Sequence, residues 1–257
     1  MEVEFSVSGS VATIRLNDPD RLNAVSPAMC DLITQYCAQV ADSPDIRAVL
    51  LKSTGRGFCS GANVSGAVDR DRSVAAGRRT YPHYQNAVRA LHHLDKPVVA
   101  AVRGPCVGVG WSLALSSDYL IASDTTKFSM IFMNRGLVPD GGAIHLLTRH
   151  IGEFRAKEIV LSRRFVLADE ALRLGLVTEA VADAELDARA EAMAAQLAEG
   201  PTLAIGIAKQ LFHTRFGSLD DFMSMERCAI PLPGQGEDVQ EGALAFAEKR
   251  APKFKGR

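Results

Sequence analysis

Two glycine-containing loops carry the residue types and spacing that are best suited to chemistry in this chain. The first, at 57–63, follows the apolar run 48–51, and the second, at 104–110, follows the apolar run 98–102. Both loops begin where a buried β-strand would end, which is where parallel sheets place their binding residues. Backbone amides from two such loops can hold one carbonyl oxygen between them, as in an oxyanion hole.

Other interpretations of these loops are weaker. Each loop taken alone is equally compatible with an ordinary turn, because glycine at a strand end often supplies only a positive φ or close packing. A Rossmann dinucleotide site is a poorer match, since Leu113 stands where the third position of that fingerprint needs a small residue. A nucleotide P-loop is excluded because no glycine-rich loop ends in Gly-Lys-Ser or Gly-Lys-Thr.

The composition is that of a globular protein. The chain has 257 residues, 47% of them hydrophobic, and a formal net charge of -1. It can bury a large core, and its charge gives no electrostatic reason to expect nucleic acid or an anionic membrane as partner. The five cysteines show no disulfide or zinc spacing, and the sequence has no basic leader and no run of about 18 apolar residues. We therefore expect a soluble, untargeted cytoplasmic protein.

The first half of the chain alternates strand and helix patterns. Strands are predicted at 11–16, 48–51 and 98–102, and helices from residue 27, from about 82 to 94, and from within the second glycine loop. This order predicts a mostly parallel sheet with right-handed crossovers. The charged stretch 69–79 is predicted to be a flexible loop, either a solvated charge run or a lid.

The second half of the chain is helical in pattern. Helices are predicted at 142–150, 153–161, 184–199, 202–214, 218–229 and 237–249. The breaks between the later helices fall at prolines and glycines, which cannot continue a regular helix. A helical layer is therefore expected after the sheet-forming part.

The two glycine loops, with segments 17–24 and 243–256, resemble the crotonase (enoyl-CoA hydratase/isomerase) family over nearly the whole chain. The resemblance implies an α/β fold, a crotonase-like spiral of β-β-α repeats with a C-terminal helical region used in trimerisation. We expect the spiral core at 1–195 and the helical region at 196–257. Trimers of this family often pair into hexamers, so these helices can be buried between subunits, whereas packing within one chain is the alternative.

The resemblance assigns the two oxyanion donors to the backbone amides of Ala62 and Val109. A thioester carbonyl becomes more anionic when the neighbouring carbon loses a proton, so each preorganised amide lowers the barrier by roughly 3 to 4 kcal/mol. Glycine usually fills the second donor position in this family, and Val109 fills it here. The amide is retained, but valine requires an ordinary backbone conformation at that position.

The resemblance also shows where acid/base residues are expected. Hydratases of this family hold a water between two glutamates, and the matching positions here are Ser112 and Phe132. A serine without an activating partner is a poor base, and phenylalanine exchanges no protons. Hydration by the two-glutamate route is therefore not expected.

One carboxylate, Asp140, remains in the segment GLVPDGG at 136–142, which resembles that of family members that shift double bonds. A single base there would remove a proton from C2 of a 3-enoyl-CoA and return it at C4. The expected activity is Δ3-Δ2 enoyl-CoA isomerase, part of fatty acid metabolism, with no prosthetic group and with coenzyme A as part of the substrate. The alternative role for Asp140 is to cap the following helix.

Coenzyme A binding is likewise implied by the resemblance. Residues on the pantetheine, phosphate and adenine side are Arg21, Leu22, Ala24, Ser60, Ala62, Asn63 and Val64. Phe246 and Lys249 match a segment that reaches the coenzyme A of a neighbouring subunit, and a charged terminal helix is the alternative. We expect a homotrimer or hexamer that binds an acyl-CoA thioester.

The acyl pocket is expected to include Trp111, Ser112 and Phe132, with core packing as the alternative for Trp111. Phe132, Met130 and Met133 favour an apolar acyl group over a charged one. Cys59 is expected to be a packing residue because no sequence neighbour would lower its pKa. Two other functions stay open: hydration or another thioester reaction on the same fold, and acyl-CoA binding without catalysis.

Overall fold

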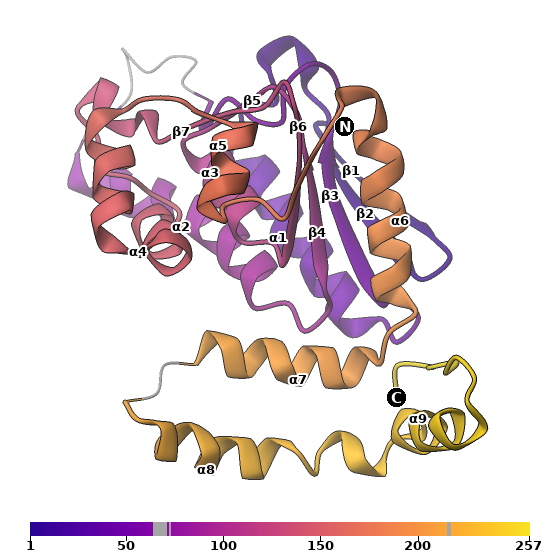
Figure 1. Ribbon diagram of the computed structural model, residues 1–257. Coiled ribbons are helices and arrows are strands. Elements are labelled where there is room, and N and C mark those ends of the chain that lie inside the picture. The colour runs from indigo at the N-terminus through magenta and orange to yellow at the C-terminus, as the bar shows by residue number, and fades with distance from the viewer. Residues whose placement is uncertain (64–70, 72, 215–216) are drawn as a thin grey trace.

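The computed structural model describes residues 1–63, 71, 73–214 and 217–257. In Figure 1 a twisted sheet stands between helices on either side, and the last helices form a separate layer below it. Val64, predicted to bind coenzyme A, lies outside the described residues, as do 69, 70 and 72 of the predicted flexible loop.

The larger sheet has six strands in the order β1-β2-β3-β4-β6-β9. Their bounds are Val3–Ser8, Val11–Leu16, Ala48–Ser53, Val98–Val102, Tyr119–Ser123 and Glu179–Val181. Only the β1–β2 pair is antiparallel, and the other neighbours are parallel. The predicted mostly parallel α/β sheet is confirmed, and the carboxyl ends of β3 and β4 meet at one edge.

A smaller sheet of three strands, β5 (Pro105–Val107), β7 (Lys127–Ser129) and β8 (Val166–Leu167), adjoins that edge. β5 pairs in parallel with β7, so the second glycine loop is itself part of a sheet. Residues 105–107 of the loop predicted after β4 are therefore held in this sheet by backbone hydrogen bonds.

Helices cover both faces of the larger sheet. Their bounds are α1 Pro27–Asp42, α2 Val74–His92, α3 Val109–Leu115, α4 Ala143–Ser162, α5 Ala168–Leu174, α6 Leu186–Ala198, α7 Thr202–His213, α8 Leu219–Ala229 and α9 Glu237–Glu248. Short 3-10 turns are η1 Pro19–Arg21, η2 Ile131–Arg135, η3 Asp183–Glu185 and η4 Pro233–Gln235. One face of this sheet is covered by α6, whose buried side chains pack against Leu50, Val99 and Ile121. β3 and β4 are apolar in continuous runs because both of their faces are buried.

The start of α2 differs from the prediction. Pro82 lies inside the helix rather than at its start, because Ser73 caps a helix that begins at Val74. The hydroxyl of Ser73 accepts a hydrogen bond from the amide of Ala76 at 3.1 Å, and such a cap satisfies a free amide of the first turn. Residues 74–79 of the predicted loop are therefore helical.

The predicted break in the second half of the chain is present within α4. Gly152 has φ 75° and ψ 162°, a conformation outside the helical region, so α4 consists of two helical segments. Gly200 and Pro201 then separate α6 from α7. The division of the chain at 195 stays a prediction, and α6 continues on the sheet as far as Ala198.

The C-terminal layer, α7 to α9, lies below the sheet in Figure 1. It exposes several large apolar side chains. Lys209 on α7 pairs with Asp118 at 2.6 Å, and the rings of His213 and His92 stack at 3.9 Å between centroids. Burial, with neighbouring positive charge, lowers the pKa of His92 to about 3. On the outer side Phe246 is 88% exposed, which is unusual for an apolar side chain of this size.

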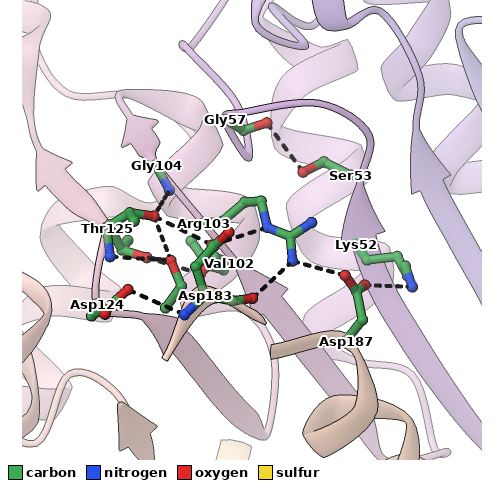
Figure 2. Close-up of polar contacts among 12 residues, drawn as sticks. Lys52, Ser53, Gly57, Val102, Arg103, Gly104, Asp124, Thr125, Asp183 and Asp187 are labelled. Atoms are coloured by element: carbon green, nitrogen blue, oxygen red, sulfur yellow. Dashed lines mark hydrogen bonds and ion pairs between the residues drawn. The ribbon is translucent and has the colours of Figure 1, made fainter. Parts of the chain in front are cut away.

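A polar network fixes the point where the second glycine loop leaves β4 (Figure 2). Arg103 pairs with Asp183 at 3.2 Å and with Asp187 at 2.7 Å, and Lys52 pairs with Asp187 at 2.6 Å. Burial acts to raise the pKa of Asp187, but hydrogen bonds from Lys52 and Arg103 outweigh it and hold that pKa below its ordinary value. The network joins the ends of β3 and β4 to the start of α6.

Candidate active site

The two glycine loops are joined by backbone hydrogen bonds in their first halves. The amide of Cys59 donates to the carbonyl of Pro105 at 3.1 Å, and the amide of Val107 donates to the carbonyl of Cys59 at 2.9 Å. Gly110 lies against Cys59 so closely that a Cβ there would be 2.6 Å from the Cys59 Cβ. Glycine at this position therefore allows the loops to meet.

The first loop is also bonded to the segment that precedes α1. The amide of Val25 donates to the carbonyl of Gly61 at 2.9 Å, and the amide of Ser60 donates to the carbonyl of Leu22 at 2.9 Å. The buried side chain of Asn23 donates to the carbonyl of Gly57 at 2.8 Å. Backbone contacts thus place Leu22 beside the loop, and Leu22 does not line the cavity described next.

A cavity of about 770 Å³ opens where these loops meet. Its lining includes eight predicted residues: Arg21, Ala24, Ser60, Ala62, Asn63, Val109, Phe132 and Asp140. It also includes Gly61, Tyr81, Tyr84, Gln85, Gly108, Ile131, Arg135, Gly136, Leu137, Val138 and Pro139. We call Gly61, Ala62, Gly108 and Val109 the amide wall. The side-chain wall consists of Ile131, Phe132, residues 135–140 and Gln85.

The amide wall has the properties of an oxyanion hole. Within the described part of the chain, the amides of Ala62 and Val109 donate to no protein acceptor. Gly108 takes the unusual conformation, φ 57° and ψ -130°, and Val109 follows as the first residue of α3. Valine fits the second donor position because the left-handed residue is Gly108.

The side-chain carboxylate of Asp140 accepts hydrogen bonds through only one of its two oxygens among the described residues. Its Oδ1 accepts hydrogen bonds from the amide of Gly141 at 2.6 Å and from Nε2 of Gln85 at 3.2 Å. The hydroxyl of Ser112 donates to the carbonyl of Asp140 at 3.1 Å. No described residue donates to Oδ2, which leaves that oxygen available to a ligand in the cavity.

The alternative role of Asp140 as a helix cap is wrong. The N-cap of α4 is Gly142, in the left-handed conformation, and no side chain caps this helix. The Gly141-Gly142 pair turns the chain, so that the carboxylate bonds to the next amide instead of to the first turn of the helix.

The pocket roles predicted for Trp111 and Ser112 need correction. Both side chains are completely buried and neither lines the cavity. Trp111 stacks on Phe128 with 5.2 Å between ring centroids, which is the alternative of core packing. Both residues lie in α3, which turns their side chains behind the amide wall. Phe132 does line the cavity, with its Cζ 3.7 Å from the position of a Cβ at Gly108.

Cys59 is confirmed as a packing residue. Burial raises the pKa of its thiol to about 11, despite hydrogen bonds with backbone groups that act in the other direction. The thiol is therefore protonated at neutral pH and is a weak nucleophile.

Gln85 escaped prediction. It lies with Tyr81 and Tyr84 on α2, whose early start the proline at 82 concealed. A helical period counted back to Ser73 would have indicated it. Phe246 and Lys249 lie at the end of α9 and outside this cavity, so their reach into a neighbouring subunit stays a prediction.

No cluster of three or more metal-binding side chains occurs among the described residues. No helix in that part of the chain is both long and apolar enough to cross a bilayer.

The two sheets, the spiral order and the C-terminal helices define the crotonase fold. A family model described as Enoyl-CoA hydratase/isomerase matches residues 6–257. The 1,2-epoxyphenylacetyl-CoA isomerase of Escherichia coli (strain K12) is 36% identical, over 98% of this chain and 97% of that protein. A protein of Rhodobacter capsulatus named probable enoyl-CoA hydratase is 34% identical, over 99% of this chain and 98% of that protein.

Among solved structures, an enoyl-CoA hydratase from Bacillus anthracis superposes with a TM-score of 0.94 and 27% identity, and the match covers 100% of both chains. The chain therefore belongs to the enoyl-CoA hydratase/isomerase family. It is an enzyme of that family, which acts on acyl-CoA thioesters.

Proposed function

We propose that this enzyme is a Δ3-Δ2 enoyl-CoA isomerase in which Asp140 is the base. The observation that carries the proposal is that Asp140 is the one carboxylate among the described residues that line the cavity, where no glutamate is present. A 1,3-shift of a proton needs one base that first accepts and then donates. Hydration with a water held between two carboxylates needs two.

The proposed reaction starts with the thioester carbonyl at the amide wall. Oδ2 of Asp140 removes a proton from C2, and the electron pair of that C–H bond moves toward the carbonyl to form a dienolate. The amides of Ala62 and Val109 stabilise the oxygen on which the negative charge develops. The protonated Asp140 then returns the proton to C4, and the double bond comes to lie between C2 and C3.

The surroundings of Asp140 support this use of one oxygen. Gly141 and Gln85 both donate to Oδ1, which orients the carboxylate and leaves Oδ2 toward the substrate. Ser112 holds the Asp140 backbone from the buried side. In this proposal Ser112 and Phe132, at the positions matched to the two glutamates, transfer no protons.

We further infer an oligomer in which coenzyme A is shared between copies. Arg21, Ala24 and Asn63 would hold the pantetheine and phosphates, while Phe246 and Lys249 of a neighbouring copy would complete the site. The exposed apolar side chains of the C-terminal layer support burial between subunits. A homotrimer or a hexamer would satisfy this arrangement.

Relatives named as an isomerase and as a hydratase match almost equally well, so the products must decide the reaction. The test is to incubate the enzyme separately with a 3-enoyl-CoA and a 2-enoyl-CoA, following the conjugated thioester absorbance and resolving products by mass. The proposal predicts conversion of the 3-enoyl to the 2-enoyl ester without a gain of water. Rapid hydration of the 2-enoyl ester would refute it, and no reaction of either would point to another isomerisation, such as that of an epoxide.

A further inference from the structure

Arg135 places a positive charge in the side-chain wall. It is the last residue of η2, and Gly136 directly after it turns the chain in a left-handed conformation with φ 67°. The amides of Gly136 and Leu137 donate back to Met133 and Phe132 at 3.1 Å each, which fixes this turn. Arg135 lines the same cavity as Phe132 and Asp140.

None of the described residues neutralises the charge of Arg135. Within the described part of the chain, no hydrogen bond or ion pair joins its guanidinium to another residue. Arg21, the other arginine that lines the cavity, pairs with Asp18 at 3.3 Å and with Glu2 at 3.9 Å. No hydrogen bond or ion pair joins Arg135 to Asp140, the one carboxylate among the described residues that line the cavity.

An apolar acyl chain is a poor occupant beside such a group. The guanidinium has five N–H donors, and a ligand that displaced their water without accepting hydrogen bonds would leave them unpaired. A carboxylate matches the planar fork in geometry and in charge. Of the three residues from which an apolar pocket was expected, Phe132 lines the cavity, and Met130 and Met133 do not.

We propose that Arg135 binds an anionic oxygen group of the substrate, a carboxylate at the far end of the acyl chain. The substrate class is then an acyl-CoA that carries a second, free carboxyl group. This inference rests on the proposed function, because it takes the cavity to be an acyl-CoA site. A phosphate of coenzyme A offers the same chemistry, but Arg21 on the first-loop side is matched to that part of the ligand, whereas Arg135 shares a wall with the base.

The test is direct binding of two unreactive saturated esters with equal carbon number, an acyl-CoA and its ω-carboxyacyl-CoA counterpart, by titration calorimetry. The wild type is expected to prefer the carboxy ester. Arg135→Leu should weaken binding of the carboxy ester by about tenfold or more and leave binding of the neutral ester unchanged. Arg135→Lys should restore part of the preference. Arg78 is an exposed arginine of α2 outside the cavity, so Arg78→Leu should change the affinity for neither ester.

Two results would overturn the proposal. If Arg135→Leu weakened binding of both esters and of free coenzyme A by the same factor, Arg135 would be assigned to a phosphate of the coenzyme. No effect on either ester would show that Arg135 recognises no anion. Because binding is measured without turnover, failure of the isomerase reaction with the carboxylate preference intact would refute the proposed function alone.

Discussion

The two walls of the cavity are built in opposite ways. The amide wall consists of backbone groups on buried loops that are bonded to each other and to the segment before α1. The side-chain wall is an exposed segment, with Val138 76% exposed, that is held by its own short turns. The difference indicates that the amide wall fixes the thioester carbonyl, while the side-chain wall determines which proton moves and which acyl group fits.

This division follows from what each wall must do. An oxyanion hole works only if its donors are placed before the charge develops, so rigid loops at strand ends suit it. Proton transfer and substrate specificity each depend on one side chain at one position of the cavity surface, and a short turn can place such a side chain. Changes in the amide wall should therefore affect folding, and changes in the side-chain wall should affect chemistry.

The largest effect is expected at the base. Asp140→Asn keeps the oxygen that accepts from Gly141 but removes the basic carboxylate, so kcat should fall by about 10²- to 10⁴-fold. Binding of a saturated acyl-CoA, measured by calorimetry, should be unchanged because the amide wall is intact. Turnover that survives the substitution would assign the base to another group.

The next effect compares Gly104, the first residue of the second glycine loop, with Gly142, which follows the side-chain wall. A Cβ at Gly104 would lie 2.0 Å from the carbonyl oxygen of Arg56, and φ there is +54°, so Gly104→Ala should cost about 3 kcal/mol or more of unfolding free energy. Gly142, with φ +73° and no neighbour within 4 Å of a Cβ, is the matched control. Gly142→Ala should cost about 1 kcal/mol in chemical denaturation, from backbone strain alone. Similar losses for both variants would contradict the rigid placement of the second loop.

A smaller effect is expected where α2 meets the base. Gln85→Leu removes the hydrogen bond to Oδ1 of Asp140 and should lower kcat by about tenfold with little change in KM. Asn86→Leu, the neighbouring exposed amide of α2 that does not line the cavity, is the control and should leave both constants unchanged. A raised KM with unchanged kcat in the Gln85 variant would mean that Gln85 contacts the substrate instead of orienting the base.

The smallest effect tests what holds the amide wall in place (Figure 2). The pKa of Asp187 is held below its ordinary value, so its contribution to stability is full above about pH 4 and is lost as the pH falls through the depressed pKa. Asp187→Asn should therefore cost about 1 kcal/mol at pH 7, a figure reduced for solvent screening, and almost nothing near pH 2 in denaturant titrations. Asp169→Asn, which removes an exposed helical pair with Arg173, should have no measurable effect. If the free energy of unfolding differed between the Asp187 variant and the wild type by the same amount at every pH, the ion pairs would be ruled out as the source of the difference.

The amide wall was largely predictable from the sequence, and the side-chain wall was not. Buried parallel strands are continuous apolar runs, and glycines after them mark the loops, so both loops could be located from the sequence. The donor positions Ala62 and Val109 within them came from the family resemblance. Gln85 and Arg135 give no such signal, because an exposed polar residue near a turn or on a helix is ordinary in any sequence. Ser112 and Trp111 were misplaced because α3 turns both side chains into the core, which the spacing of glycines does not reveal.

The most direct test of the two-wall account is the carbonyl stretching frequency of a bound 2-enoyl-CoA labelled with ¹³C at the thioester carbonyl, measured by difference infrared spectroscopy. Binding should shift this band to lower frequency, because the amides of Ala62 and Val109 polarise the carbonyl. The same shift should occur in the inactive Asp140→Asn enzyme. A bound ester whose band does not move, or a shift that disappears with the Asp140 carboxylate, would contradict the assignment of carbonyl binding to the amide wall.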